Sequence, residues 1–482
     1  MSGNMADIEL CYMPAIDQMR LFRARKLSPV EVLAAQLRRI KILNAGLVAV
    51  TEIHADEAMA MAQESERRYM RGEGVRALEG VTVAVKDEVD IAGWRVTAGS
   101  LANRNAEPAA KDCCFGGYLR AAGAVLHVQT NVPEYYCNVV TWNHLWGTTR
   151  NPWNPAISPG GSSGGSAAAL AAGFATLATG SDMGGSIRVP AAMCGLYGFK
   201  PPYGRVATSL MQMESEGPMA RNFADMVLMQ NACSGPVDSM PSTIRPKLEY
   251  PQDYEGLAGL KIAFDPMEKW GLPMDGETGR ALLDTVARLE KLGATVEEVD
   301  LGLRADDFET YVEAVFSTYM GPYCFEAARK YPEETTPYLK ALAEKCRGRT
   351  CPKAMDRADT WVQDHSLAIK ERVFRRGFSA ILMPTIATPQ VPADLGNTPE
   401  NDFITINGGQ YPGGDWRYCF TWPWNMMGWY PVVSVPVGRS GIGVPLGAQI
   451  IADTYDDLAA FRVAAALSAG DPGFFRGGFF PG

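Results

Sequence analysis

The stretch from Ser158 to Pro202 constrains this 482-residue chain more than any other. It contains two glycine-rich serine turns, GGSSGG at residues 160–165 and DMGGS at residues 182–186, joined by an alanine-rich segment. Such small residues suit a tightly packed helix, which would hold the two turns side by side. Glycine clusters occur where the backbone takes positive φ or approaches another group closely, and a run of N–H groups then forms an anion-binding nest. The stretch therefore predicts a rigid backbone cradle.

A flexible linker is the alternative interpretation, because linkers are commonly rich in glycine and serine. The flanks argue against it. Residues 167–172 and 187–192 are apolar, whereas a linker would be polar on both sides.

A serine at the end of such a nest has the character of a nucleophile with its own oxyanion hole. Serine is a weak nucleophile and needs a base. Residues 81–85 are an apolar, β-prone run that delivers Lys86 to the end of a strand. A lysine there loses hydration, which favours the neutral amine that can act as a base. A single lysine after a strand is more often a solvated charge, so the hypothesis rests on the combination of lysine and serine turns.

These residues resemble the amidase signature family of serine hydrolases. The motifs that carry the resemblance are a Lys-Asp pair after GVTVAV at residues 80–85, GGSSGGS at 160–166 and GSDMGGSIRVPA at 180–191. The spacing of Ser162 and Ser186 is also similar to that of the family. Kindred segments follow at 130–134, 149–155, 217–221, 434–438 and 445–450, so the resemblance covers nearly the whole chain.

The resemblance implies a Ser-cisSer-Lys triad. Ser186 matches the family nucleophile, Ser162 the bridging serine after a cis peptide bond, and Lys86 the base, so that a proton would pass from Ser186 through Ser162 to Lys86. The implied oxyanion donors are the backbone N–H groups of Met183, Gly184, Gly185 and Ser186. Such donors contribute about 3–4 kcal/mol each to catalysis in other hydrolases.

Three further residues are expected to support this site. The resemblance gives Asp182 and Arg188 a role in holding the nucleophile loop, although in isolation they would be a plain salt bridge. Ser163, beside the bridging serine, is expected to hydrogen-bond within the same network, with an ordinary turn hydroxyl as the alternative.

The substrate is indicated by an aromatic segment at residues 411–430. Aromatic walls suit a bulky acyl or aryl group, although core packing explains most of the rings equally well, and we expect only one or two to face a ligand. His144 lies in a loop that the family places near its active site. The candidate substrate contacts are His144, Trp424 and Met426, and the wider set of candidate lining residues is Met211, Met213, Trp416, Trp422, Met427 and Trp429.

The resemblance implies an amidase that hydrolyses carboxylic amides through an acyl-enzyme, with bulky or aryl amides as the expected substrates. Esterase and carbamate hydrolase (urethanase) activities are admissible, because they would use the same nucleophile and oxyanion hole. Two alternatives stay open: the glutaminase subunit of a tRNA-dependent amidotransferase, and a non-catalytic scaffold. The aromatic segment at 411–430 suits glutamine, with its charged α-groups, poorly.

A histidine-based triad is a competing hypothesis, because residues 160–164 also satisfy the G-x-S-x-G pattern of α/β-hydrolases. That chemistry needs a histidine late in the chain. Only His365 follows the serines, and it lies in a helical run at 361–375 with no loop signals. His127 lies in a strand pattern and is expected to be structural.

Charge and cysteine usage exclude several classes. The net charge is −9 and no basic run occurs, which argues against nucleic-acid and anionic-membrane partners. Residues 167–178 are too short to span a bilayer, and the N-terminus does not have the pattern of a signal peptide. The ten cysteines lack C-x-x-C pairs, which favours reduced thiols in a cytoplasmic protein over disulfides or a zinc site. We expect no cofactor or metal and a small-molecule substrate, and leave a homodimer open.

The expected fold is α/β, with a central mixed, twisted sheet covered by helices on both faces. Short apolar strands and helices alternate from residue 80 to 130, and strands of the same character return after 380. We therefore expect a single domain over 1–482. Its expected parts are an N-terminal helical cover (1–75), a catalytic core (80–205), a helix-rich excursion (206–379) and a C-terminal return to the sheet (380–482). Within the N-terminal cover, a Ser28–Glu31 capping box predicts the start of a helix.

Overall fold

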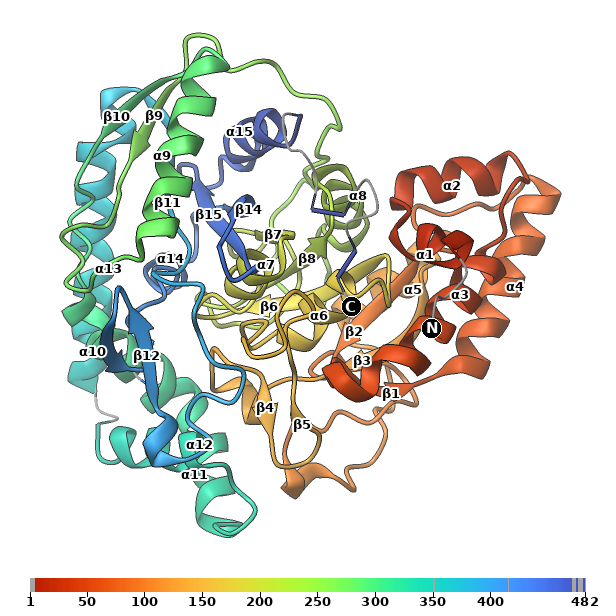
Figure 1. Ribbon diagram of the computed structural model, residues 1–482, viewed down its shortest axis with the longest axis horizontal. Helices are drawn as coiled ribbons and strands as arrows, with labels where there is room; N and C mark the ends of the chain where they lie inside the picture. Colours follow the sequence, from red (N-terminus) through yellow and green to blue (C-terminus); the bar gives the residue numbers. More distant parts are fainter. Residues whose placement is uncertain (1–4, 350–351, 415, 470–473, 476–479, 482) are drawn as a thin grey trace.

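The computed structural model describes residues 5–349, 352–414, 416–469, 474–475 and 480–481 (Figure 1). Its centre is an 11-stranded sheet with the order β1-β3-β2-β6-β8-β7-β14-β15-β11-β9-β10. The bounds of these strands are β1 Val50–Ile53, β2 Thr82–Lys86, β3 Val125–Thr130, β6 Leu177–Asp182, β7 Tyr197–Lys200, β8 Ser215–Ala220, β9 Lys261–Phe264, β10 Thr295–Glu298, β11 Phe378–Pro384, β14 Val432–Arg439 and β15 Pro445–Ile451. Two small two-stranded sheets pair β4 (Trp142–Asn143) with β5 (Gly147–Thr148) and β12 (Phe403–Ile406) with β13 (Gly409–Pro412).

The central sheet is mixed, as predicted. Strand β2 pairs in parallel with β3 and with β6, whereas β6 and β7 both pair antiparallel with β8. Strand β14 joins β7 on one side and β15 on the other, both antiparallel. The C-terminal strands therefore lie directly beside the strands of the catalytic core, although a long stretch of the chain separates them in sequence.

Helices flank this sheet, with α2, α3 and α4 gathered at the β1 end, α9 and α13 at the β10 end, and α10, α11 and α12 lower in the view, away from β10 (Figure 1). The α-helices are α1 Met5–Tyr12, α2 Ala15–Arg23, α3 Pro29–Leu47, α4 Ala55–Arg71, α5 Cys114–Ala122, α6 Gly164–Ala171, α7 Arg188–Cys194, α8 Phe223–Cys233, α9 Gly276–Lys291, α10 Phe308–Tyr311, α11 Gly321–Lys330, α12 Pro337–Cys346, α13 Pro352–Arg372, α14 Pro423–Met426 and α15 Asp457–Ala469. The short helical turns are η1 Leu101–Asn103, η2 Glu134–Tyr136, η3 Ala305–Asp307, η5 Phe374–Arg376 and η6 Pro399–Asn401, and η4 Val312–Met320 is a π-helix.

The N-terminal helical segment agrees with the sequence in its caps and differs in one strand. Ser28 and Glu31 form the predicted capping box at the start of α3, which satisfies backbone donors that a helix end leaves free. Strand β1, inside the segment expected to be helical, pairs antiparallel with β3 at the sheet edge. Its four residues are too few to produce a recognisable alternation beside two long helical patterns.

The segment 206–379, expected as a helix-rich excursion, contains both helices and strands. It supplies β8, β9 and β10 to the central sheet, and only its second half, from η3 to η5, is wholly helical. The helical part includes the π-helix η4, which packs against α10, α11 and α13.

Helix α6 is the buried element that brings the two serine turns together. All of its residues are buried, and it packs against β2, β6 and α7. At Gly165 a side chain would collide with the backbone of Asn131, so glycine is required there by close approach. In the described part of the chain, none of the helices is both long and apolar enough to cross a bilayer.

Candidate active site

Lys86 ends strand β2 and is fully buried. Its Nζ donates hydrogen bonds to Ser162 Oγ at 2.8 Å and to Ser181 Oγ at 2.6 Å. Glu88 Oε2 lies 2.8 Å from the same nitrogen, and the ring of Tyr136 lies over it with its centroid at 5.1 Å. The lysine that the sequence singles out is therefore not a solvated charge, because every contact it makes is inside the protein.

The two serine turns lie against each other, as the alanine-rich segment between them predicts. The Gly161–Ser162 peptide bond is cis. The N–H of Ser163 donates to the carbonyl of Ser186 at 3.2 Å, and Ser163 Oγ donates to the carbonyl of Ser181 at 3.4 Å. Ser162 and Ser186 both line one cavity, so the bridging serine and the nucleophile candidate face the same space.

The backbone cradle differs from the expectation at one residue. Met183, Gly184 and Ser186 line the cavity. Gly185 does not, and its N–H donates to Asp182 Oδ1 at 2.9 Å. The Gly185 N–H is therefore engaged in holding the turn and is corrected from an oxyanion donor to a structural one. Gly185 has φ +126°, and an added Cβ would collide with Thr421 Oγ1, which explains why this position needs glycine.

The carboxylate of Asp182 organises the turn that carries Ser186. It accepts the N–H groups of Gly185, Ile187 and Arg188 at 2.9, 3.1 and 3.3 Å. It also forms a fully buried ion pair with the Arg188 guanidinium, with Nη2 to Oδ1 at 2.8 Å. Burial alone would raise the pKa of the Asp182 carboxyl, but the charge and hydrogen bonds of Arg188 outweigh it and hold the pKa below its ordinary value.

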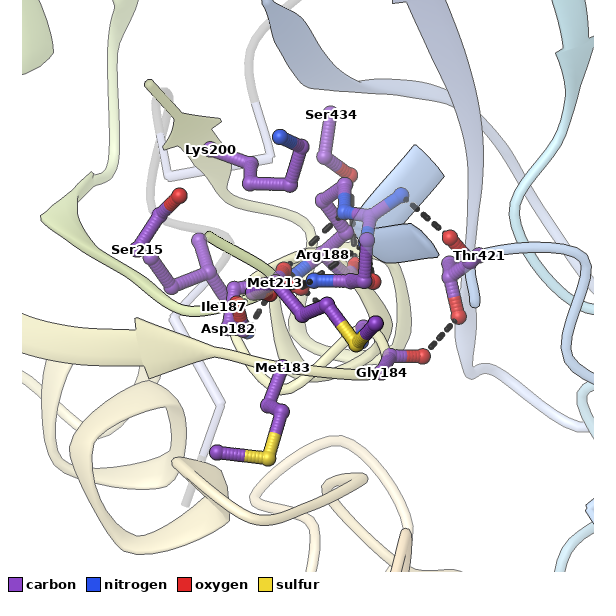
Figure 2. Close-up of polar contacts among 12 residues, drawn as sticks. Asp182, Met183, Gly184, Ile187, Arg188, Lys200, Met213, Ser215, Thr421 and Ser434 are labelled. Atoms are coloured by element: carbon purple, nitrogen blue, oxygen red, sulfur yellow. Dashed lines mark hydrogen bonds and ion pairs between the residues drawn. The ribbon is translucent and has the colours of Figure 1, made fainter. Parts of the chain in front are cut away.

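Arg188 connects this turn to the C-terminal part of the chain, as Figure 2 shows where its guanidinium reaches from Asp182 to Thr421. The guanidinium uses all five of its N–H donors. They go to both oxygens of Asp182, to the carbonyl of Thr421 at 3.0 Å, and to the side chains of Gln449 and Asn425 at 2.6 Å each. Thr421 Oγ1 in turn donates to the carbonyl of Gly184 at 2.5 Å. The expected supporting role of Asp182 and Arg188 thus has a physical basis in this network.

The cavity beside the serines has a volume of about 450 Å³. We call one side the polar wall, formed by Glu88, Ser162, Ser181, Ser209, Glu214 and the cradle residues Met183, Gly184 and Ser186. We call the other side the aromatic wall, formed by residues 308–320 of the helical segment together with Trp416 and Trp422. Tyr311 joins the two, because its hydroxyl donates to the carbonyl of Met183 at 3.1 Å.

The aromatic segment at 411–430 supplies two rings to the cavity, Trp416 and Trp422, in line with the expectation of one or two. Met211 also lines the cavity, whereas Met213, Met427 and Trp429 are not among its lining residues. Among the other described rings of the segment, Tyr418, Phe420, Trp424 and Tyr430 are buried in the hydrophobic core.

The three expected substrate contacts lie elsewhere and are corrected. His144 is exposed, with Nδ1 3.0 Å from the carbonyl oxygen of Glu334. Trp424 is fully buried, and its Nε1 donates to Met383 Sδ at 3.2 Å. Met426 is fully buried in the core. The sequence shows that the segment is aromatic and loop-like, but packing alone decides which of its side chains turn toward the cavity.

The geometry does not support the histidine-based triad. No histidine is among the cavity-lining residues in the described ranges. His365 lies on α13 with Nδ1 2.9 Å from the carbonyl oxygen of Trp361. His127 is buried on β3 with Nε2 2.8 Å from the carbonyl oxygen of Phe174, and burial lowers its pKa to about 4. Within the described residues, no cluster of three or more His, Cys, Asp or Glu side chains is arranged to hold a metal ion.

Two kinds of residue at this site were not predicted from the sequence. Glu88, Ser181 and Glu214 bring carboxylates and a hydroxyl to the polar wall. Glu88 could have been noticed from its position two residues after Lys86, whereas the helical residues carry no local signal of facing a cavity. The helical residues that form most of the aromatic wall are Phe308, Tyr311, Phe316, Tyr319 and Met320.

Comparison with known proteins agrees with this arrangement. The family model described as Amidase matches residues 31–460 of the chain. The chain belongs to the amidase signature family. Among solved structures, a bacterial aryl acylamidase of this family superposes with a TM-score of 0.84 at 30% identity, covering 96% of each chain.

Curated relatives within the amidase signature family carry two kinds of name. An acylamidase of Rhodococcus erythropolis is 29% identical over 97% of both chains. A glutamyl-tRNA(Gln) amidotransferase subunit from Carboxydothermus hydrogenoformans is 40% identical over a region that spans 61% of this chain and 62% of that protein. Membership of the family supports amide hydrolysis as the reaction. The two names point to different substrates, so the substrate of this chain has to be inferred from its own cavity.

Proposed function

We propose that this chain is an amidase that hydrolyses bulky or aryl carboxylic amides, with Ser186 as nucleophile, Ser162 as bridging serine and Lys86 as base. The observation that carries the proposal is the 2.8 Å hydrogen bond from Lys86 Nζ to Ser162 Oγ, at the edge of a cavity that Ser186 also lines. A buried amine connected through a hydroxyl to a cavity serine is the arrangement that activates a serine without histidine.

The reaction follows from this arrangement. Ser186 Oγ attacks the amide carbonyl carbon while its proton moves to Ser162 Oγ and the proton of Ser162 moves to Lys86 Nζ. The cradle N–H groups of Met183, Gly184 and Ser186 stabilise the negative charge that develops on the carbonyl oxygen. The proton returns by the same route to the leaving nitrogen, the C–N bond breaks, and an acyl-enzyme remains. Water then attacks the ester with the same base, releasing the carboxylic acid and regenerating Ser186.

The aromatic wall supports the choice of substrate. Trp416, Trp422 and the rings of residues 308–319 give the cavity an apolar side, and such surfaces bind aryl and bulky acyl groups. Esters and aryl carbamates are further substrates on this proposal, because their carbonyls would meet the same serine and the same cradle.

Glutaminase activity is the second candidate, and the name of the Carboxydothermus relative favours it. Glutamine presents a charged α-carboxylate that needs a cationic partner. The charged side chains among the described cavity-lining residues are Glu88 and Glu214, both acidic, with no lysine or arginine. This charge distribution suits an aryl amide better than it suits glutamine.

The test is a panel of anilides, aliphatic amides, esters, aryl carbamates and glutamine, assayed with the wild type, Ser186→Ala, Ser162→Ala and Lys86→Ala. We expect turnover of anilides, none in Ser186→Ala or Lys86→Ala at unchanged circular dichroism, and severe impairment in Ser162→Ala. A fluorophosphonate should label Ser186, which also tests the scaffold alternative. Release of ammonia from glutamine without anilide turnover would overturn the substrate assignment.

The chain offers matched controls for both residue types. Lys200 is also fully buried, but its Nζ lies near the carbonyls of Pro201 and Gly428, at 3.5 and 3.4 Å, and burial lowers its pKa to about 7. Ser215, drawn in Figure 2, is buried on β8 opposite Asp182. Its Oγ donates to the carbonyl of Pro201 at 2.8 Å. Lys200→Met and Ser215→Ala should keep fluorophosphonate labelling. Loss of labelling in Lys200→Met with retention in Lys86→Ala would show that Lys86 is the wrong lysine for the base.

A further inference from the structure

The amine of Lys86 has three acceptors around it. A charged lysine carries three N–H donors and no acceptor. Here the three contacts are Ser162 Oγ at 2.8 Å, Ser181 Oγ at 2.6 Å and Glu88 Oε2 at 2.8 Å. The ammonium form is thus satisfied in full, and one of its partners is a carboxylate.

The same geometry also prepares the neutral form. A neutral amine keeps two N–H donors and gains one lone pair. If the two N–H groups stay on Ser181 and Glu88, the lone pair faces Ser162, from which the base must receive a proton. Glu88 and Ser181 are themselves connected, because Ser181 Oγ donates to Glu88 Oε2 at 2.6 Å. One carboxylate oxygen therefore anchors both the amine and the serine that orients it.

The backbone holds Glu88 in this place. The N–H groups of Glu88 and Val89 donate to the carbonyl of Lys86 at 2.7 and 3.0 Å. This tight turn after β2 folds the chain back so that a residue two positions beyond the lysine can reach its side chain. The Glu88 side chain is only 17% exposed, so its contact with the amine is weakly screened by water.

We propose that Glu88 is a positioning residue, which together with Ser181 holds the Lys86 amine so that its lone pair is aimed at Ser162. This inference rests on the proposed function, because it gives Glu88 a role only through Lys86 as the base. It adds a residue to the triad whose effect is felt on kcat rather than on substrate binding.

Other titratable groups face the same amine and have to be separated from Glu88. Asp87 directs its carboxylate to the N–H of Thr97 at 2.8 Å, and burial raises its pKa to about 6. From the loop before β8 and from β8 itself come Glu214 and Glu216. Burial, with the charge of Glu88, raises the pKa of Glu214 to about 7, and burial raises the pKa of Glu216 well above its ordinary value.

Tyr136, whose ring covers the amine, is buried, and burial raises its pKa well above 10. It stays neutral through the working range. Among the carboxylates that face Lys86, Glu88 is the one for which the structure gives a direct contact with the nitrogen, and this difference makes a matched comparison possible.

The test compares kcat and KM for an anilide in Glu88→Gln, Glu88→Leu and Glu214→Gln with those of the wild type. Glutamine keeps an acceptor oxygen for the amine and for Ser181, so kcat should fall only modestly. Leucine removes this acceptor, so kcat should fall by about tenfold or more while KM stays unchanged. Glu214→Gln should lower kcat by less than half as much as Glu88→Leu does.

Each outcome bears on the proposal. A Glu88→Leu enzyme with the kcat of the wild type, in a chain that Lys86→Ala inactivates, would overturn it, and so would an equal fall of kcat in Glu88→Leu and Glu214→Gln. Equal kcat values for the glutamine and leucine variants would overturn it as well, because the acceptor oxygen would then not matter. Activity that survives in Lys86→Ala would instead refute the proposed function, which keeps the two failures distinguishable.

Discussion

The polar wall and the aromatic wall of the cavity are held in different ways. On the polar wall, Asp182 and Arg188 fix the serine turn through hydrogen bonds in which every guanidinium donor has a partner. On the aromatic wall, Trp416 is held by ring contacts, with centroids 5.3 Å from Phe316 and 6.2 Å from Phe308. Directional bonds fix atoms at the precision that bond cleavage needs, whereas ring packing tolerates changes of shape. On the proposed function, the polar wall therefore carries out the reaction and the aromatic wall selects the substrate.

The largest expected effect is on the network behind the polar wall. Arg188→Met leaves the Asp182 carboxylate charged and buried without its partner, so we expect unfolding to become easier by about 3–5 kcal/mol. Urea denaturation measures the change. Arg245→Met removes an exposed ion pair with Asp238 and should change stability by about 0.5 kcal/mol or less.

If Arg188→Met is too unstable to purify, Asp182→Asn provides the same test from the other side, because it leaves the guanidinium uncompensated. Losses no larger than that of the exposed pair would contradict the view that this wall is fixed by its buried charges.

The next effect concerns the cradle. Gly185→Ala places a Cβ against Thr421 Oγ1 at a residue with φ +126°, which displaces the turn that presents Met183, Gly184 and Ser186. We expect kcat to fall by about 10²–10³-fold, comparable to the loss of an oxyanion donor. Steady-state kinetics on an anilide measures this.

Gly117→Ala is the matched control, since nothing lies within 4 Å of its added Cβ on helix α5. A Gly185→Ala enzyme as active as Gly117→Ala would show that the cradle has room to adapt, and the two walls would then not differ in rigidity.

On the aromatic wall we expect selectivity to change more than rate. Trp416→Ala removes a ring from the cavity and should lower kcat/KM for an anilide by about tenfold relative to a small aliphatic amide. Trp424→Ala removes a ring of the same size from the core, which should cost about 3–5 kcal/mol of stability and leave the ratio of the two substrates unchanged. The opposite pattern would mean that Trp424, and not Trp416, meets the substrate.

The smallest effect is a pH dependence of binding. Because the pKa of Glu214 is raised to about 7, its carboxyl is largely protonated below neutrality and charged above it. An apolar ligand strips water from the charged form, so affinity for a neutral aryl amide should fall a few-fold as pH rises from about 6 to 8. Titration calorimetry on Ser186→Ala measures this without turnover, and Glu214→Gln should abolish the trend. A trend that persists in that variant would place its origin outside Glu214.

Of the polar wall, the two serine turns could be predicted from the sequence together with the lysine behind them, because their chemistry lies in short motifs, whereas Glu88, Ser181 and Glu214 were missed. Lys86 follows a strand directly, and the turns with Ser162 and Ser186 carry their own glycine patterns. The contact between Lys86 and Ser162 was therefore foreseeable. The engagement of the Gly185 N–H by Asp182 was not, because consecutive N–H groups look equivalent in a sequence.

The aromatic wall could not be predicted in the same way. Trp416 and Trp424 are eight positions apart in one aromatic segment, and only the packing of the helical segment decides that the first faces the cavity and the second the core. Residues such as Tyr311 and Phe316 come from a π-helix and its neighbour far from any catalytic motif. Side chains that come together only through tertiary packing have no recognisable pattern in the local sequence.

The reach of Arg188 has a consequence for how the enzyme is made. Its guanidinium is completed by Thr421, Asn425 and Gln449, which are synthesised long after the turn that they support. A chain still on the ribosome and not yet extended past residue 449 already has the Asp182–Arg188 ion pair, but it lacks acceptors for the other guanidinium donors. The turn that carries Ser186 is therefore completed by contacts from residues synthesised 233 to 261 positions later.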